Sequence, residues 1–221
     1  MNILLLRHSA GFEHSYLPNA EVTFKHLAQE NGWRVTTTHL LGNIKEDVLK
    51  SLDVLVFATT GNLALDAAQK KLVIDFVRNG KGFMGIHNGA DTGYDWPEYG
   101  EMVGGYFTGH PWTQEVTVKV EDPNHPAVRH LGRSFRVFEE VYTFKNWDRK
   151  KTHVIMSLDN SSVDISKGNR PDNDYAMAWC HSFGKGRVMY TALGHPDDLW
   201  SKTWFQTHIV GGLKYAAGLE G

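Results

Sequence analysis

A histidine stands where the backbone pattern of this sequence is typical of a catalytic nucleophile. Gly85-Ile86-His87-Asn88-Gly89 ends an apolar run that predicts a buried strand. Glycines on either side of a central residue at a strand's end permit the sharp turn of a nucleophile elbow, which lifts that side chain above the sheet edge. Imidazole is a poor replacement for an acyl-transfer nucleophile, but it serves as base, acid or metal ligand. We therefore predict that His87 performs proton-transfer or metal chemistry.

A second imidazole follows another predicted strand. Gly194-His195-Pro196 comes directly after the apolar residues 188–193, and the proline restricts the turn. Ligands of open α/β sheets bind beyond the carboxyl ends of the strands. We expect His195 and His87 to share that edge with His14, which lies in the polar loop after the first predicted strand.

Carboxylates and aromatic residues surround these histidines in the sequence. Asp91 follows the elbow and could either orient His87 or cap the next helix. Glu139 and Glu140 are adjacent on a predicted strand and must point to opposite faces, so we expect one in the cleft and the other in solvent. The sequence leaves open which is which. Tyr94 and Trp96 suit either stacking on a sugar or core packing.

These patterns give two sets of candidate site residues. The catalytic candidates are His87, His195, Asp91 and Glu140. The substrate-binding candidates are His14, Tyr94, Trp96, His110, Glu139 and His181. His181 is included because it should point away from its neighbour Cys180, which we expect to be a buried, inert thiol.

A metal site is an alternative use of the histidines. Neutral imidazoles of His14, His87, His110 and His195, with one carboxylate, could hold zinc or manganese. No H-x-x-x-H or H-E-x-x-H spacing occurs, so the ligands would converge from separate loops. The sequence requires no cofactor, and a divalent metal stays open.

The elements that must position these residues change character along the chain. Strand patterns at 3–7, 33–39, 53–58 and 83–86 alternate with helical patterns at 19–31, 46–52 and 65–78, which predicts a parallel, doubly wound sheet. The second half is richer in strands, at 115–120, 136–144, 154–158, 175–180 and 187–192, before a helix at 204–217. No linker interrupts residues 1–221, so we expect a single domain.

Composition narrows the classes of partner. A net charge of −2 and the lack of a basic run indicate neither a nucleic-acid partner nor an anionic membrane partner. The one cysteine excludes an internal disulfide framework. The apolar N-terminal stretch is too short for a signal peptide. We expect a cytoplasmic protein that acts on a small molecule, and self-association into a homo-oligomer is left open.

The chain resembles the ThuA-like (trehalose utilisation) family of the class I glutamine amidotransferase-like superfamily. The resemblance is carried by Gly11-Phe12 with His14, by the run from Gly80 to Pro111, by Glu139-Glu140-Val141-Tyr142 and by the run from Ala176 to Asp198. It implies a flavodoxin-like three-layer α/β/α sandwich with a mainly parallel sheet. Amidotransferases carry cysteine at the elbow and a later His-Pro-Glu. His87 and His195-Pro196-Asp197 occupy the analogous segments, which argues against Cys-dependent glutaminase activity.

The resemblance implies an enzyme of carbohydrate catabolism. We expect it to act on trehalose-related or 3-keto glycosides by His-based acid–base chemistry, as a sugar isomerase, lyase or hydrolase. The alternative is a non-catalytic sugar-binding or regulatory domain on an amidotransferase-like scaffold, with aromatic residues such as Tyr94 and Trp96 as stacking surfaces.

Overall fold

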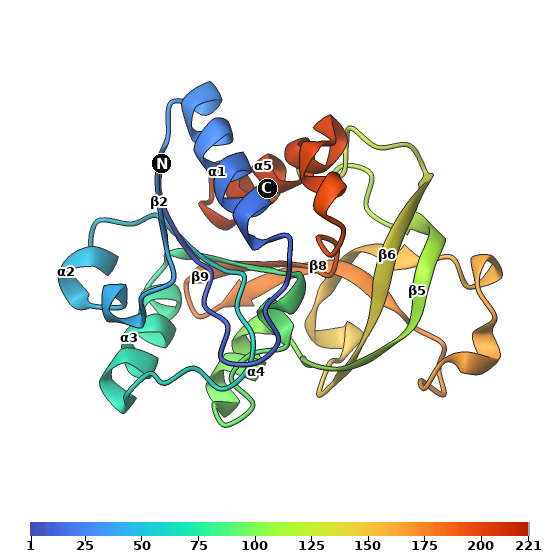
Figure 1. Cartoon of the computed structure of the whole chain (residues 1–221), viewed down its shortest axis with the longest axis horizontal. Helices are drawn as coiled ribbons and strands as arrows, with labels where there is room; N and C mark the ends of the chain where they lie inside the picture. Colours follow the sequence, from blue (N-terminus) through green and yellow to red (C-terminus); the bar gives the residue numbers. More distant parts are fainter. Residues whose placement is uncertain (221) are drawn as a thin grey trace.

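The computed structural model describes residues 1–220, which are organised around one nine-stranded sheet of order β2-β1-β3-β4-β9-β8-β7-β5-β6 (Figure 1). The first five strands of that order are parallel. They are β2 (Arg34–Thr38), β1 (Asn2–Leu6), β3 (Val54–Phe57), β4 (Gly82–Ile86) and β9 (Gly186–Thr191). The other four are antiparallel to their neighbours: β8 (Ala176–Phe183), β7 (His153–Leu158), β5 (Tyr106–Val120) and β6 (Ser134–Lys145).

The sheet is therefore mixed, and the expectation of a mainly parallel sheet holds only for its first half. The reversal occurs at the turn Gly184-Lys185, where β8 and β9 form a hairpin. Beyond β8 the chain returns to the sheet through hairpin-type pairings rather than helical crossovers, and such pairings are antiparallel. The long β5–β6 ribbon closes this end of the sheet (Figure 1).

Helices cover both faces of the parallel half (Figure 1). Helices α1 (Leu17–Asn31) and α5 (Thr203–Ala216) pack on one face, and α2 (Glu46–Leu49), α3 (Ala67–Arg78) and α4 (Pro97–Val103) on the other. Strand β3 shows why its sequence is apolar at every position. Val54 and Val56 belong to the core under α1 and α5, whereas Leu55 and Phe57 belong to the core under α3 and α4.

This topology leaves one sheet edge for the loops that follow β1, β4 and β9. Because the three strands are parallel, their carboxyl ends open on the same side. Within residues 1–220, no helix is both long enough and apolar enough to cross a membrane.

Candidate active site

The turn after β4 has the strained backbone of an elbow. His87 has a left-handed φ of 45°, which is costly for a residue with a side chain. A Cβ at Gly89 would lie 2.8 Å from the carbonyl oxygen of Phe57, and one at Gly85 would lie 3.0 Å from the Tyr190 ring. Glycine at both positions therefore lets the backbone around the short 3₁₀ helix His87–Ala90 pack closely against Phe57 and Tyr190.

The imidazole of His87 is held through both ring nitrogens. Nδ1 lies 2.8 Å from the carbonyl oxygen of Ala192, which can only accept, so Nδ1 carries the proton. Nε2 then accepts from the hydroxyl of Tyr142 at 2.9 Å. The ring is fully buried, and burial lowers its pKa. His87 thus presents the lone pair of Nε2 to the site.

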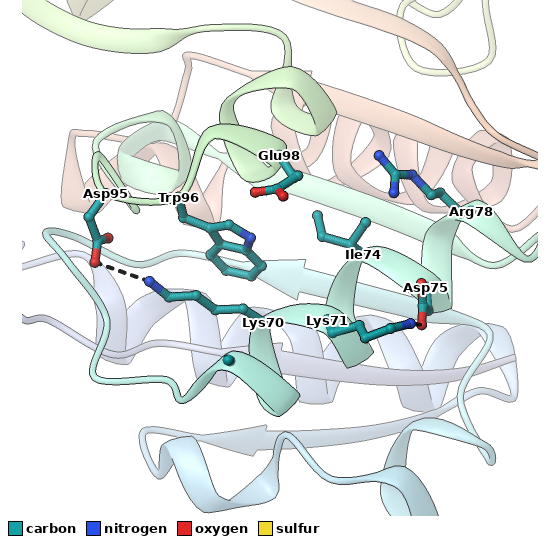
Figure 2. A pocket seen from close by; sticks show the side chains of 9 residues that line it. Lys70, Lys71, Ile74, Asp75, Arg78, Asp95, Trp96 and Glu98 are labelled. Atoms are coloured by element: carbon teal, nitrogen blue, oxygen red, sulfur yellow. Dashed lines mark hydrogen bonds and ion pairs between the residues drawn. The ribbon is translucent and has the colours of Figure 1, made fainter.

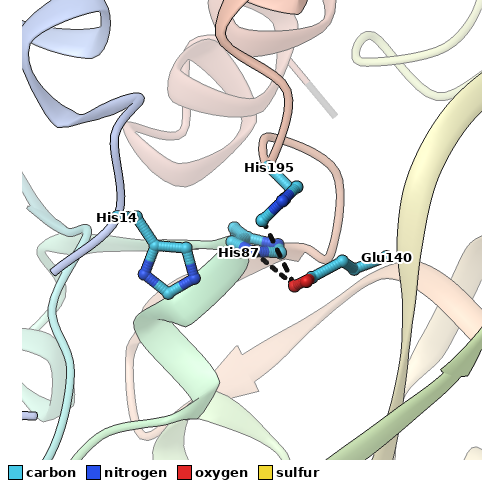
Figure 3. Close-up of side chains that lie close together, drawn as sticks. All are labelled: His14, His87, Glu140 and His195. Carbon is cyan, nitrogen blue, oxygen red and sulfur yellow. Dashed lines mark ion pairs between the residues drawn. The ribbon is translucent and has the colours of Figure 1, made fainter. Parts of the chain in front are cut away.

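Four side chains converge beside this nitrogen (Figure 3). His14, His87, Glu140 and His195 each offer a nitrogen or oxygen atom, and these atoms all lie within 4.8 Å of one another. We call them the histidine–glutamate cluster. Oε2 of Glu140 lies 3.6 Å from Nε2 of His87 and 3.2 Å from Nδ1 of His195. Loops of the parallel half supply the three histidines, and strand β6 supplies Glu140.

Burial favours the neutral imidazoles of His14 and His87 beside an ionised Glu140. Burial lowers the pKa of His14 to about 3, and the positive charges that His87 and His195 would carry lower it further. Burial opposes ionisation of Glu140, but the nearby imidazoles of His87, His195 and His110 outweigh burial and lower the pKa of Glu140.

Glu139 faces the opposite side of β6 and is fully buried, so the expectation that the second glutamate is solvated is wrong. Its carboxyl accepts hydrogen bonds from the backbone N–H groups of Gly194 at 2.8 Å and His195 at 3.1 Å. Burial raises its pKa to about 8, although these N–H donors act in the other direction. Glu139 therefore holds the loop that carries His195, and Glu140 is the glutamate in the cleft.

A pocket of about 290 Å³ opens above the cluster. Of the expected site residues, Asp91, His110, His14, Glu140 and His195 line it, while His87 lies beneath them. Asp91 neither orients His87 nor caps the next helix, which begins after Trp96: its carboxylate accepts from the hydroxyl of Tyr94. Nε2 of His110 lies 3.6 Å from Oε1 of Glu140.

Tyr94 and Trp96 lie outside this pocket. Tyr94 stacks on Tyr106, and its hydroxyl bonds to Asp91 and to the carbonyl of Phe107. Trp96 lines a different and larger cavity of about 470 Å³ beside helix α3 (Figure 2). The lysines there are paired, Lys70 with Asp95 at 3.0 Å and Lys71 with Asp75, and no histidine lines it. We call this cavity the α3 groove. It is larger than the pocket above the cluster, but its lining offers no group suited to proton transfer comparable to the histidines.

His181 lies away from the pocket, which corrects its expected role. Because β8 runs antiparallel to β9, its carboxyl end lies at the sheet edge opposite the cluster, and His181 pairs in register with Val188. Its Nε2 lies 3.0 Å from the carbonyl oxygen of Met102 in α4. Cys180 points to the other face and is buried, and burial raises its pKa to about 11.

Three pocket residues escaped the sequence analysis. Tyr142 lies two positions after Glu140 on β6, so strand alternation could have placed both on one face. Phe12 is 69% exposed and contacts His14 edge-on, with ring centroids 4.9 Å apart. Phe107 packs on Tyr142 at 4.2 Å. An exposed aromatic in a loop at the carboxyl edge was the available indication for Phe12.

The fold and site together define an α/β protein with a histidine at the elbow and a histidine-rich pocket at the carboxyl edge. The chain belongs to the ThuA family, described as trehalose utilisation, whose model matches residues 2–216. That membership supports a role in carbohydrate utilisation. No curated protein matches the chain.

Several solved structures share the fold. A ThuA-like protein from Bacteroides uniformis is 24% identical with a TM-score of 0.82, over 98% of this chain and 91% of its own. A ThuA-like protein from Parabacteroides merdae is 16% identical with a TM-score of 0.77, over 98% and 90%. A cytoplasmic protein from Salmonella typhimurium LT2 is 12% identical with a TM-score of 0.65, over 98% and 99%. At these identities the likeness concerns the fold alone.

Proposed function

We propose that this protein is an enzyme of carbohydrate catabolism that acts on trehalose-related glycosides or their 3-keto derivatives by acid–base chemistry in the histidine-rich pocket. The observation that carries the proposal is the convergence of imidazoles and carboxylates from distant segments on one small pocket. Membership of a trehalose utilisation family supports the substrate class.

A 3-keto sugar suits such a pocket because its carbonyl acidifies the neighbouring C–H bonds. A base removes the proton from C2, and the C–H electrons form an enolate whose charge rests on the C3 oxygen. The enolate then collapses to expel the glycosidic oxygen from C1, which takes a proton from an acid. The products are an enone and an alcohol. Isomerisation results instead if the C2 hydroxyl passes its proton to the C3 oxygen and C3 is then protonated, which moves the ketone from C3 to C2.

The positions of the side chains divide these tasks. Asp91 and His110 line the pocket outside the tight cluster, so we assign them proton removal and proton donation. Burial raises the pKa of Asp91, which makes its carboxylate a stronger base. His87 is fully buried with both ring nitrogens engaged. We therefore assign His87 and Glu140 to holding the site in place, and His195, which lines the pocket, to stabilising the developing charge on the substrate oxygen through a ring N–H.

Turnover of synthetic 3-keto-trehalose, measured beside trehalose itself, tests this function. Enone absorbance and released sugar report elimination, and proton NMR reports isomerisation. We expect Asp91→Asn to lower the rate at least about 100-fold. Asp95→Asn is the matched control, because Asp95 lies on the α3 groove and pairs with Lys70. Unchanged substrates, or an Asp91→Asn variant as active as the wild type, would refute the assignment.

The alternative of a sugar-binding module has one supporting observation, the aromatic pocket wall of Phe12 and Phe107. Calorimetric titration with the same sugars separates the two functions. Saturable binding without turnover favours the module, and any turnover that depends on Asp91 excludes it.

We also propose that the chain works as a single cytoplasmic domain with a flavodoxin-like α/β/α arrangement in its parallel half. The family match over residues 2–216 and the helices on both faces support this arrangement. Cell fractionation followed by immunoblotting tests the location: recovery of the protein with the periplasm or the membrane pellet would contradict it.

A further inference from the structure

We propose that the histidine–glutamate cluster binds one first-row divalent transition metal, zinc or manganese. The inference concerns the pocket of the proposed function, but it rests on the geometry of His14, His87, Glu140 and His195 and does not depend on the substrate. Metal binding can therefore be right where the substrate is wrong, and the reverse.

The spacing of the donor atoms is that of a coordination shell. Metal–ligand bonds of about 2.0–2.2 Å place tetrahedral donors about 3.4 Å apart. Oε2 of Glu140 lies 3.6 Å from Nε2 of His87 and 3.2 Å from Nδ1 of His195, on either side of that value. All four donor atoms lie within 4.8 Å of one another. Small side-chain movements would bring them to one ion.

Buried nitrogens without hydrogen-bond partners provide a second, independent observation. Nδ1 of His14 and Nδ1 of His195 are buried, and neither makes a hydrogen bond within residues 1–220. The 3.2 Å approach of His195 to Glu140 is thus a close contact without a hydrogen bond. A buried polar atom without a partner costs about 1–3 kcal/mol, and a bound cation would satisfy such lone pairs.

Groups next to the cluster fix its side chains by hydrogen bonds, as the residues that surround a metal site orient the metal ligands. Nδ1 of His87 donates to the carbonyl of Ala192, which directs the lone pair of Nε2 toward Glu140. Glu139 binds the backbone N–H groups of Gly194 and His195 and so fixes the second loop. The hydroxyl of Tyr142, now on Nε2 of His87, would have to release that nitrogen.

The donor types select the class of ion. Three imidazole nitrogens and one carboxylate suit zinc, manganese and their neighbours, whereas calcium and magnesium prefer oxygen ligands throughout. The pocket lies directly above the cluster, so a substrate oxygen could approach the ion from that side as a fifth ligand. An ion there would supply Lewis-acid stabilisation to a substrate oxygen.

Elemental analysis and calorimetry test the site directly. Untagged protein purified without chelator is analysed for metal, then stripped, dialysed and titrated with Zn²⁺ and with Mn²⁺ alone. We expect about one ion per chain and a higher thermal midpoint for the loaded protein. His195→Ala and Glu140→Gln should each weaken binding at least about 100-fold. His26→Ala is the matched control, because His26 lies exposed on α1 and outside the cluster.

Each outcome decides the proposal. A chain that carries no ion and shows no saturable binding of either metal overturns it. The proposal is also overturned if His195→Ala and Glu140→Gln both bind the metal as tightly as the wild type. His195 is partly exposed and Glu140→Gln preserves shape, so circular dichroism should show both variants folded. Metal binding without turnover would retain the metal site and refute the proposed function. A metal-free, fully active protein would do the opposite.

Discussion

The two halves of the sheet contribute to the pocket in different ways. The parallel half has short strands, most of them buried, and offers histidines only from the loops beyond its strand ends: His14, His87 and His195. The antiparallel half has longer strands, and it offers side chains from the strands themselves, Glu140 and Tyr142 on β6 and His110 on β5. A strand buried on both faces has no side chain free for chemistry, whereas a strand with one open face does.

The comparison teaches that neither half makes a site alone. Within the histidine–glutamate cluster, the imidazoles of the parallel half have no carboxylate until β6 brings Glu140 between His87 and His195. The neighbouring Glu139 then ties β6 to the loop after β9. Of these two adjacent glutamates, Glu140 therefore completes the site, and Glu139 joins the two halves of the sheet that form it.

Removing the carboxylate of Glu140 should have the largest effect and would show whether the antiparallel half takes part in the chemistry. We expect Glu140→Gln to lower turnover of 3-keto glycosides about 100-fold or more, because the three imidazoles lose their shared anion. Steady-state kinetics on the same substrate measures it. Glu115→Gln, an exposed glutamate paired with Arg136 on the same ribbon, is the control. A loss under about threefold would exclude Glu140 from the chemistry.

Acid should weaken the packing around α5 through His208. Burial lowers the pKa of His208 to about 4, whereas the unfolded chain titrates near 6.5. Above pH 6.5 both states are neutral. Below it the unfolded chain takes up a proton that the folded chain refuses, so stability falls until about pH 4, on the order of 2 kcal/mol at pH 5.

Urea unfolding at pH 7 and pH 5 measures the effect of His208. His208→Gln, which can still donate to the carbonyl of Ala127, should lose less stability than the wild type over this range. The exposed His26→Gln should behave as the wild type. Equal losses in wild type and His208→Gln would assign the acid sensitivity to other groups, such as His125, whose pKa burial lowers to about 4.

Glu139→Gln tests the connection between the halves. The amide can accept through one oxygen only, so at least one of the N–H groups of Gly194, His195 and Glu140 loses its acceptor. We expect a loss of about 1–3 kcal/mol in unfolding free energy and a lower kcat, as the His195 loop loosens. Urea denaturation and kinetics together measure this. Reduced stability with unchanged kcat would limit Glu139 to a structural role.

Phe12→Ala should affect substrate binding more than catalysis. Phe12 lies on the pocket wall contributed by the parallel half, with most of its ring exposed. Loss of an aromatic face costs about 0.5–1.5 kcal/mol, so we expect KM to rise about 3- to 10-fold with little change in kcat. Phe138→Ala, an exposed phenylalanine on β6 outside this pocket, should change neither. A fall in kcat at constant KM would contradict a binding role.

Substitutions at the opposite end of β8 should have the smallest effect. Cys180→Ala and His181→Ala should each retain turnover within about twofold, because Cys180 packs in the core and His181 bonds to Met102 of α4, both away from the pocket. Kinetics of the two purified variants measures this. Rapid labelling of Cys180 with simultaneous inactivation, or a dead His181→Ala variant, would show that β8 reaches the site after all.

The local sequence pattern was enough to predict most helices and strands. It also predicted three of the four residues of the histidine–glutamate cluster without an alternative. Predicted helices at 19–31 and 65–78 correspond to α1 and α3, and the hairpin to β8 and β9. His14, His87 and His195 were found because each follows a predicted strand at the carboxyl edge. Helix α4 and the first half of β5 were missed, since Pro97–Val103 is short and the glycine, histidine and proline around Gly109 obscure the alternation.

Only the tertiary structure decided which side chains meet. Alternation required Glu139 and Glu140 to diverge, but the pairing of β6 beside the loop after β9 selected Glu140 for the cleft and buried Glu139. Likewise, the antiparallel direction of β8 places His181 away from the site. Trp96 lines the α3 groove instead of the pocket above the cluster. Sequence periodicity is a local property, and it assigns a residue to one face of its strand. Which other segments lie against that face depends on the order and direction of the strands, and these are set by long-range packing.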